Sequence, residues 1–147
     1  MKALLKPVIV AAAGILVLGA LPSCSEKAKQ ERAAESAAET AADAMEDYCK
    51  ILESIKDKES GKAAIAKMDG LADKFAKVAE KAKKAGNTPP DAATQAKVDE
   101  KTKALQDRMT KAVTSAMTVL ATDPELAKSF GEKMQLIGTK MAAAQAK

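Results

Sequence analysis

Apolar residues recur at alternating intervals of three and four positions along four segments of this chain, and this spacing constrains the fold most. It places the side chains of each segment on one side of an α-helix. The four sets are Ala34, Ala38, Ala41, Met45, Tyr48, Leu52 and Ile55; Ile65, Met68, Ala72, Phe75, Ala79 and Ala82, beside Leu71 and Val78; Val98, Thr102, Leu105, Met109, Ala112, Ala116 and Val119; and Ala127, Phe130, Met134, Ile137, Met141 and Ala144. Each apolar stripe needs a covering helix, so the sequence predicts an all-α bundle.

Capping residues between the segments predict where the helices begin and end. Ser60 is the expected N-cap of the second helix, and Gly86 with Asn87 is its expected C-terminal stop. The run Thr88-Pro89-Pro90-Asp91 predicts a cap at Thr88 and a proline in the first turn, and Asp123-Pro124-Glu125 repeats this logic. We expect helices over residues 33–57, 61–85, 89–122 and 124–145.

These helices predict an antiparallel four-helix up-down bundle with alanine-rich heptad seams. A proline can also kink a helix instead of ending it, so the alternative at Pro124 is a three-helix bundle with a kinked C-terminal helix. Small side chains let helix axes approach closely. Gly131 and Gly138, seven residues apart in the last helix, are therefore expected to line one close contact.

The first 23 residues have the features of an export signal. Lys2 and Lys6 precede an uncharged apolar run from Val8 to Leu21, which is shorter than the ~20 residues that a membrane-spanning helix needs. A cleaved signal peptide fits this pattern better than a permanent span.

The junction Leu21-Pro22-Ser23-Cys24 resembles the lipobox of bacterial lipoproteins. Leu21, Ser23 and Cys24 match its pattern, and Pro22 replaces a usually small residue. The resemblance covers residues 1–25 and implies that Cys24 carries a lipid such as palmitate and becomes the mature N-terminus. In enteric lipoproteins an aspartate after the cysteine retains the protein in the inner membrane. Ser25 stands at that place here, which implies the outer membrane, facing the periplasm.

This resemblance divides the chain into three parts. Residues 1–23 are the expected signal peptide, residues 24–32 are a lipidated cysteine with a polar tether, frayed or helical, and residues 33–147 are the helical bundle. The alternative is a secreted protein without lipid, or a signal anchor in which Cys24 has no role.

Composition argues against several classes of function. The chain has no histidine, three aromatic residues and a formal net charge of +4, two units of which lie in the leader. It therefore lacks the basic excess and the stacking groups of a nucleic-acid binder. C-x-x-C pairs, glycine-rich phosphate loops and serine elbows are also missing from the sequence. We expect no enzyme, no cofactor and no metal site.

The remaining sulfur and carboxylate groups have structural interpretations. Cys49 is expected to be a small buried residue, with an intermolecular disulfide as the alternative. The methionines lie mainly on the apolar stripes, where they fill the core, and a Cu(I) site is their alternative role. The carboxylates Glu46, Asp47, Glu53 and Asp57 are expected on a solvated face, with a weak cation site as the alternative.

The sequence favours a structural or interaction role, as scaffold or adaptor, for an envelope or cell-wall partner. Homo-oligomers are expected through the small-residue side of the last helix or through Cys49. One alternative is a periplasmic bundle that binds a metal or a lipid. Another follows from Lys147, which resembles the terminal lysine that joins the major murein lipoprotein to peptidoglycan and implies a cell-wall tether.

Overall fold

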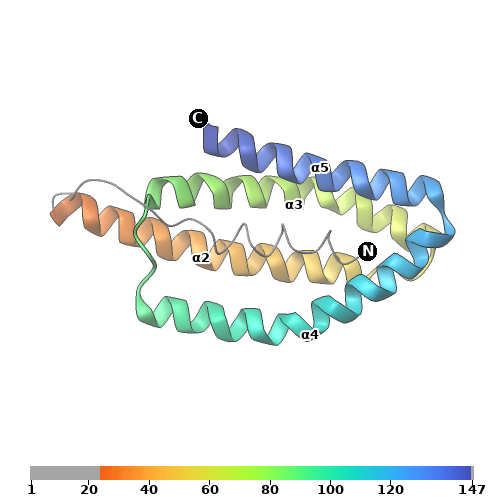
Figure 1. The fold of residues 1–147 in the computed structure, drawn as a ribbon, viewed down its shortest axis with the longest axis horizontal. Coiled ribbons are helices and arrows are strands. Elements are labelled where there is room, and N and C mark those ends of the chain that lie inside the picture. The colour runs from red at the N-terminus through yellow and green to blue at the C-terminus, as the bar shows by residue number, and fades with distance from the viewer. Residues whose placement is uncertain (1–23, 147) are drawn as a thin grey trace.

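Residues 24–146, which the computed structural model describes, form four α-helices and no β-strand (Figure 1). The helices are α2 (Cys24–Glu53), α3 (Lys58–Ala85), α4 (Ala92–Thr122) and α5 (Pro124–Ala146). Successive helices run in opposite directions along the molecule, so the expected all-α, four-helix bundle is confirmed. The chain reverses at Asp123, and α5 returns beside α3 instead of prolonging α4.

The helices pack in the order α4, α2, α3, α5. α2 packs against both α3 and α4, and α3 packs against α5, whereas α4 makes few contacts with α3 or α5 (Figure 1). The spatial neighbours α2 and α3 are antiparallel. α4 runs in the same direction as α2, and α5 in the same direction as α3. The two central helices are therefore covered on two sides, and the two outer helices on one.

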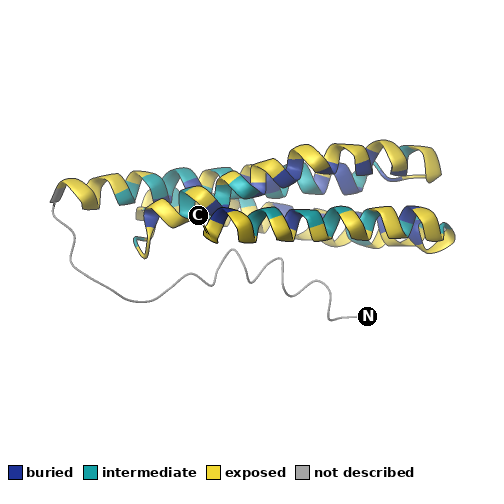
Figure 2. Ribbon diagram, turned by 90° about the horizontal axis from the view of Figure 1, so that it is seen from above, coloured by how far each residue is buried: buried dark blue, intermediate teal, exposed yellow. Residues whose placement is uncertain are grey.

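The core is thickest where the α2–α3 loop and the α4–α5 corner meet. Its largest fully buried side chains are Leu52, Ile55, Met68 and Cys49, from α2, the following loop and α3. Towards the start of α2 the buried residues are alanines, including Ala34 and Ala37. Figure 2 shows the buried positions on the sides where the helices face one another. Alanine buries few methylene groups, so this end of the bundle gains less from packing.

The first half of α4 has little cover. No residue between Ala92 and Ala104 is buried, and burial begins at Leu105. Thr102, expected on the apolar stripe of this helix, is exposed. The expectation was wrong because only α2 packs closely on α4, and beside this half it makes ion pairs with Lys101 without burying any side chain of α4.

Two of the expected helix starts are corrected by the structure. α3 is capped by Asp57, whose carboxylate accepts a hydrogen bond from the Ser60 N–H at 2.8 Å, while Ser60 Oγ accepts one from the Asp57 N–H at 3.0 Å. Ser60 is therefore the third helical residue and the partner in a capping box, not the N-cap.

α4 is capped by Asp91, which accepts a hydrogen bond from the Thr94 N–H at 2.6 Å. The expected cap at Thr88 is wrong. A residue before a proline is disfavoured in the helical conformation, and Thr88 and Pro89 both precede prolines, so the helix begins only after Pro90. α2 ends at Glu53 instead of the expected residue 57, because Asp57 caps α3. Two further ends agree with expectation. Gly86 ends α3 with a φ of 59°, and the Asp123 carboxylate accepts a hydrogen bond from the Leu126 N–H at 3.0 Å.

Among the glycines within the helices, the close contact occurs at Gly61 and not at the glycines of α5. A Cβ built on Gly131 or Gly138 would meet no atom within 4 Å, so the expected close contact there is wrong. These glycines lie on the exposed side of α5, whose apolar side faces α3. A Cβ on Gly61 would lie 2.6 Å from Cδ2 of the buried Leu126. Gly61 therefore makes room for Leu126 as α5 leaves the corner.

We predict opposite effects of adding one methyl group at these glycines. Gly138→Ala should stabilise the protein by about 1 kcal/mol, because alanine is the better helix former and the site is open. Gly61→Ala should destabilise it, because the new methyl group displaces Leu126. Chemical denaturation measures both changes, and Leu126→Ala should remove the penalty at Gly61. Equal stabilisation by both glycine substitutions would contradict the close contact.

Candidate functional site

The residues before the bundle continue α2 as a helix. Cys24 is the first residue of α2, and residues 25–29 are exposed. Thr88 Oγ1 donates to Gln30 Oε1 at 3.1 Å, so contact with the α3–α4 loop begins at Gln30. Of the two forms expected for residues 24–32, the helical one is present, and Figure 1 shows this end of α2 extending past the other helices. Residues 1–23, expected to be a signal peptide, and Lys147 lie outside the described residues.

A cluster of four charged side chains joins α2 to α4. Lys101 Nζ lies 2.7 Å from Asp43 Oδ1 and 2.9 Å from Glu46 Oε2, and Lys50 Nζ lies 2.7 Å from Glu46 Oε1. Hydrogen bonds from Lys50 and Lys101 stabilise the ionised carboxylate and lower the pKa of Glu46 to about 2. The cluster connects the two helices where α4 buries no side chain of its own.

A second ion pair between α2 and α4 covers Cys49. Arg108 binds Glu53 through two bonds, Nε to Oε1 at 3.0 Å and Nη2 to Oε2 at 2.8 Å. Cys49 Sγ donates to Glu53 Oε1 at 3.7 Å, and the residue is 0% exposed. Burial and the neighbouring carboxylate raise the pKa of the Cys49 thiol. The expected burial of Cys49 is confirmed, and the folded chain would have to open before this thiol met another.

The other carboxylates link the remaining helix pairs. Asp47 on α2 binds Lys74 on α3. On α3, Asp69 accepts from Lys133 Nζ at 2.6 Å and Asp73 binds Lys140, both from α5. The acidic side chains therefore hold helices together through ion pairs at the surface. Within residues 24–146, no group of three or more acidic or cysteine side chains is arranged to hold a metal ion.

The methionines occupy the places expected for gap-filling residues. Met68 and Met109 are buried, and Met45, Met134 and Met141 pack against the core while partly exposed. Tyr48 Oη donates to Met134 Sδ at 3.7 Å, and burial raises the pKa of Tyr48 to about 12. Sulfur accepts hydrogen bonds weakly, so this contact mainly places the ring against α5. Met117, at 50% exposure, is the exception to core packing.

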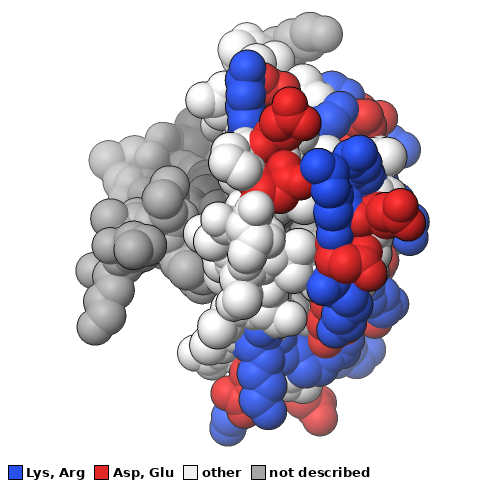
Figure 3. Space-filling model, turned by 90° about the vertical axis from the view of Figure 1, so that its right-hand side faces the viewer, with Lys and Arg blue, Asp and Glu red and all other residues white. Residues whose placement is uncertain are grey.

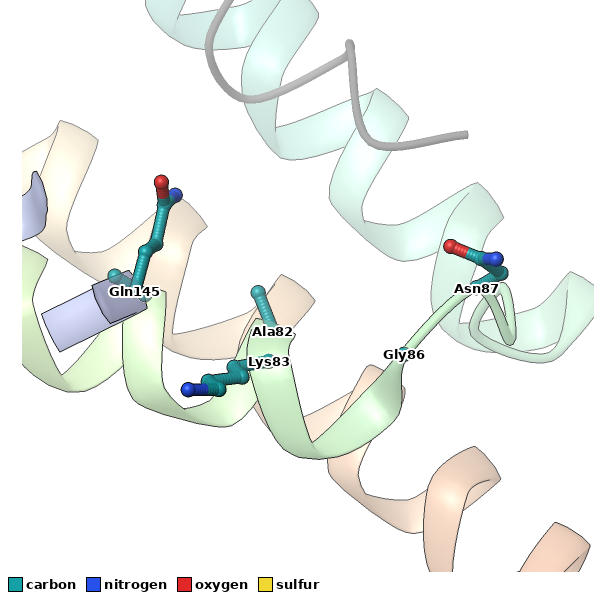
Figure 4. Close-up of a pocket in the computed structure, with 6 residues that line it drawn as sticks. Ala82, Lys83, Gly86, Asn87 and Gln145 are labelled. Carbon is teal, nitrogen blue, oxygen red and sulfur yellow. The ribbon is translucent and has the colours of Figure 1, made fainter. Parts of the chain in front are cut away.

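Two open hollows mark the surface. One, of about 280 Å³, lies at the end of α3 and is lined by Ala79, Ala82, Lys83, Gly86, Asn87 and Gln145. Figure 4 shows that the polar side chains of Lys83, Asn87 and Gln145 do not converge on a common point. The other, of about 200 Å³, lies at the α4–α5 corner, and its lining includes Lys58 and Asp123, which form an ion pair at 2.7 Å. Neither has the converging polar groups typical of a ligand site.

The charged exterior is uneven. Figure 3 views the end of the molecule where α4 meets α5. Basic and acidic side chains lie next to one another over the right of the view and at its top and bottom, around an area of uncharged side chains. In the described part of the chain no polar or charged residue is buried. The groups available to a partner therefore lie on the outer faces of the helices.

None of the helices that the structure describes is both long enough and apolar enough to cross a membrane. Comparison of the chain with protein-family models, with curated protein sequences and with solved structures gave no significant match.

We predict that Glu46→Gln lowers the midpoint of thermal unfolding at pH 7, because it removes the partner of Lys50 and Lys101. The pKa of Glu46 is lowered from 4.5 to about 2, so its contribution is present above pH 4.5 and is lost as the pH falls towards 2. The difference between the two proteins should therefore shrink over that range. Glu39→Gln is the matched control, since Glu39 is exposed and forms no ion pair within the described residues. A difference that stays constant down to pH 2 would contradict this role of Glu46.

Proposed function

We propose that this chain is a lipid-anchored protein of the bacterial cell envelope, with a structural or protein-interaction role as a scaffold or adaptor. The observation that carries the proposal is the lipobox-like run Leu21-Pro22-Ser23-Cys24, whose cysteine is also the first residue of α2. In this proposal palmitate-type acyl chains on Cys24 hold the protein at the outer membrane, facing the periplasm. More than one acyl chain is needed for stable anchoring.

The position of α2 supports this proposal. The helix that would carry the lipid is also one of the two central helices, in contact with both α3 and α4. Because α2 is one continuous helix of 30 residues, it would connect a lipid on Cys24 directly to the most buried part of the core. The exposed residues 25–29 would then separate the membrane surface from the first contact of the bundle, at Gln30.

The distribution of polar groups supports recognition through a surface. Interhelical ion pairs occupy many charged side chains near the seams, such as Arg108 with Glu53 and Lys133 with Asp69. Away from the seams, the long outer sides of the helices are open, as on the two outer helices, α4 with five buried residues and α5 with three. An elongated helical surface of this kind suits a partner that binds along it.

We predict that Cys24→Ala abolishes incorporation of labelled fatty acid and releases the protein from the membrane fraction. Crosslinking in intact envelopes followed by pull-down should recover a defined partner with the wild type but not with this variant. Cys49→Ala is the matched control and should retain both the label and the partner, because Cys49 is buried.

Equal labelling of wild type and Cys24→Ala would contradict the anchor. The interaction role would fail if Met134→Leu eliminated a measurable activity while fold, anchor and partner recovery persisted. Such behaviour belongs to a catalytic or ligand site.

A further inference from the structure

The side of α4 that points away from the bundle carries a second regular pattern. Nine positions spaced by three and four residues lie on it, and all nine are exposed. We call this set the outer face of α4. It consists of Ala93, Ala96, Glu100, Lys103, Asp107, Thr110, Thr114, Met117 and Ala121. The buried residues of the helix, from Leu105 to Leu120, lie on its opposite side. This spacing places the nine positions in one stripe along the helix, against which another helix can lie.

Charges on the two sides of α4 differ in whether they have partners. Lys101 and Arg108, beside α2, form ion pairs with that helix. On the outer face, Glu100, Lys103 and Asp107 form no ion pair with any described residue, and neither does the neighbouring Lys111. The outer face therefore presents acidic and basic groups in a fixed order, free to pair with another molecule.

The second half of the outer face is uncharged. No charged residue occurs from Ala112 to Thr122. The hydroxyl groups of Thr110, Thr114 and Thr118 donate to backbone carbonyl oxygens four residues earlier, at 3.0, 2.9 and 3.0 Å. Their hydrogen bonds are thus made within the helix, which favours methyl groups at the surface beside Met117.

A partner helix would stabilise the first half of α4. Residues 92–104 contain no buried side chain, although helices in proteins owe most of their stability to packing of one face. A second helix laid along the outer face would shield this half from solvent.

We propose that the outer face of α4 binds a second copy of this chain, with the two α4 helices antiparallel and a two-fold axis at the level of Leu105. In this register Lys103 lies opposite Asp107 of the other copy, and Lys111 lies next to Glu100 of the other copy. The small Ala93 and Ala96 lie opposite Met117 and Thr114. The two-fold axis repeats each pair, so Lys103 and Asp107 each face an opposite charge, and Glu100 lies beside Lys111 of the other copy. A parallel arrangement in register would instead place like charges together.

The contact runs from Ala93 to Met117, or roughly 36 Å at 1.5 Å per residue. A contact between two single helices lies at the small end of specific interfaces, so the dimer should be weak and reversible. Attachment of both copies to one membrane would raise their effective concentration. The inference goes beyond the proposed function and rests on it only for this last effect.

The test uses full-length chains with two different tags, co-expressed, extracted in mild detergent and recovered through one tag. Lys103→Glu should lower recovery of the second tag about tenfold when both copies carry it, because two attractions become two repulsions. Asp107→Lys in both copies should do the same. A mixture of one Lys103→Glu copy and one Asp107→Lys copy should restore recovery, because opposite charges again face each other between the chains.

In this mixture each substituted α4 still carries like charges near one another. Restored recovery therefore reports pairing between the two chains and not an effect within one helix. Lys128→Glu and Glu132→Lys form the matched control, because these α5 residues have the same spacing and order, are exposed, and form no ion pair within the described residues. They should leave recovery unchanged, and circular dichroism should show unchanged helix content throughout. The proposal is overturned if wild-type copies do not associate, if the mixture fails to associate, or if the α5 substitutions weaken association as much as those on α4.

Discussion

The antiparallel seam between α2 and α3 is the contact on which the remainder of this molecule depends. Leu52, Ile55 and Met68, among the most deeply buried side chains, belong to these helices or to the loop that joins them. Burying one such side chain contributes about 1.5–3 kcal/mol, whereas an exposed ion pair contributes about 0–1 kcal/mol. The apolar seam therefore determines stability. α4 and α5 each pack mainly on one side of it and hardly on each other.

Ion pairs determine which helix packs where. Lys101 and Arg108 join α4 to α2, Lys74 joins α3 to α2, and Lys133 and Lys140 join α5 to α3. These connections reproduce the packing order α4, α2, α3, α5. Alanine-rich seams fit one another in many combinations and distinguish poorly between neighbours. Charged residues beside the seams penalise the wrong neighbour, so weak surface pairs act on specificity more than on stability.

The helices were predictable from sequence because their apolar spacing and their caps are local signals. Reversal at Asp123 could be predicted for the same reason, since an aspartate followed by a proline is a typical helix start. The packing order was not predictable, because a stripe indicates that a helix needs cover but not which helix supplies it. The first apolar stripe widened in the structure, with Ala37 and Cys49 also buried, because α2 is covered from two sides.

Two further features of the structure, the contact at Gly61 and the charged outer face of α4, have a signal in the sequence outside the predicted apolar stripes. Gly61 precedes Ile65 and Met68 by four and seven residues, so it continues the apolar stripe of α3 as a gap that receives Leu126. Glu100, Lys103 and Asp107 likewise follow regular spacing, on the side of α4 opposite its core. A regular pattern of polar residues is informative once the structure shows which side of the helix is exposed.

Native-state hydrogen exchange tests the central role of the α2–α3 seam most directly. Amide protons of residues 44–52 and 64–75 should exchange most slowly, and those of residues 92–104 should exchange much faster. Met68→Ala should weaken protection in all four described helices, because each outer helix packs on the seam that it disrupts. Ile137→Ala should act mainly on α5, since Ile137 lies on an outer helix. The account is contradicted if residues 92–104 are protected as strongly as the seam, or if Met68→Ala weakens protection in α3 alone.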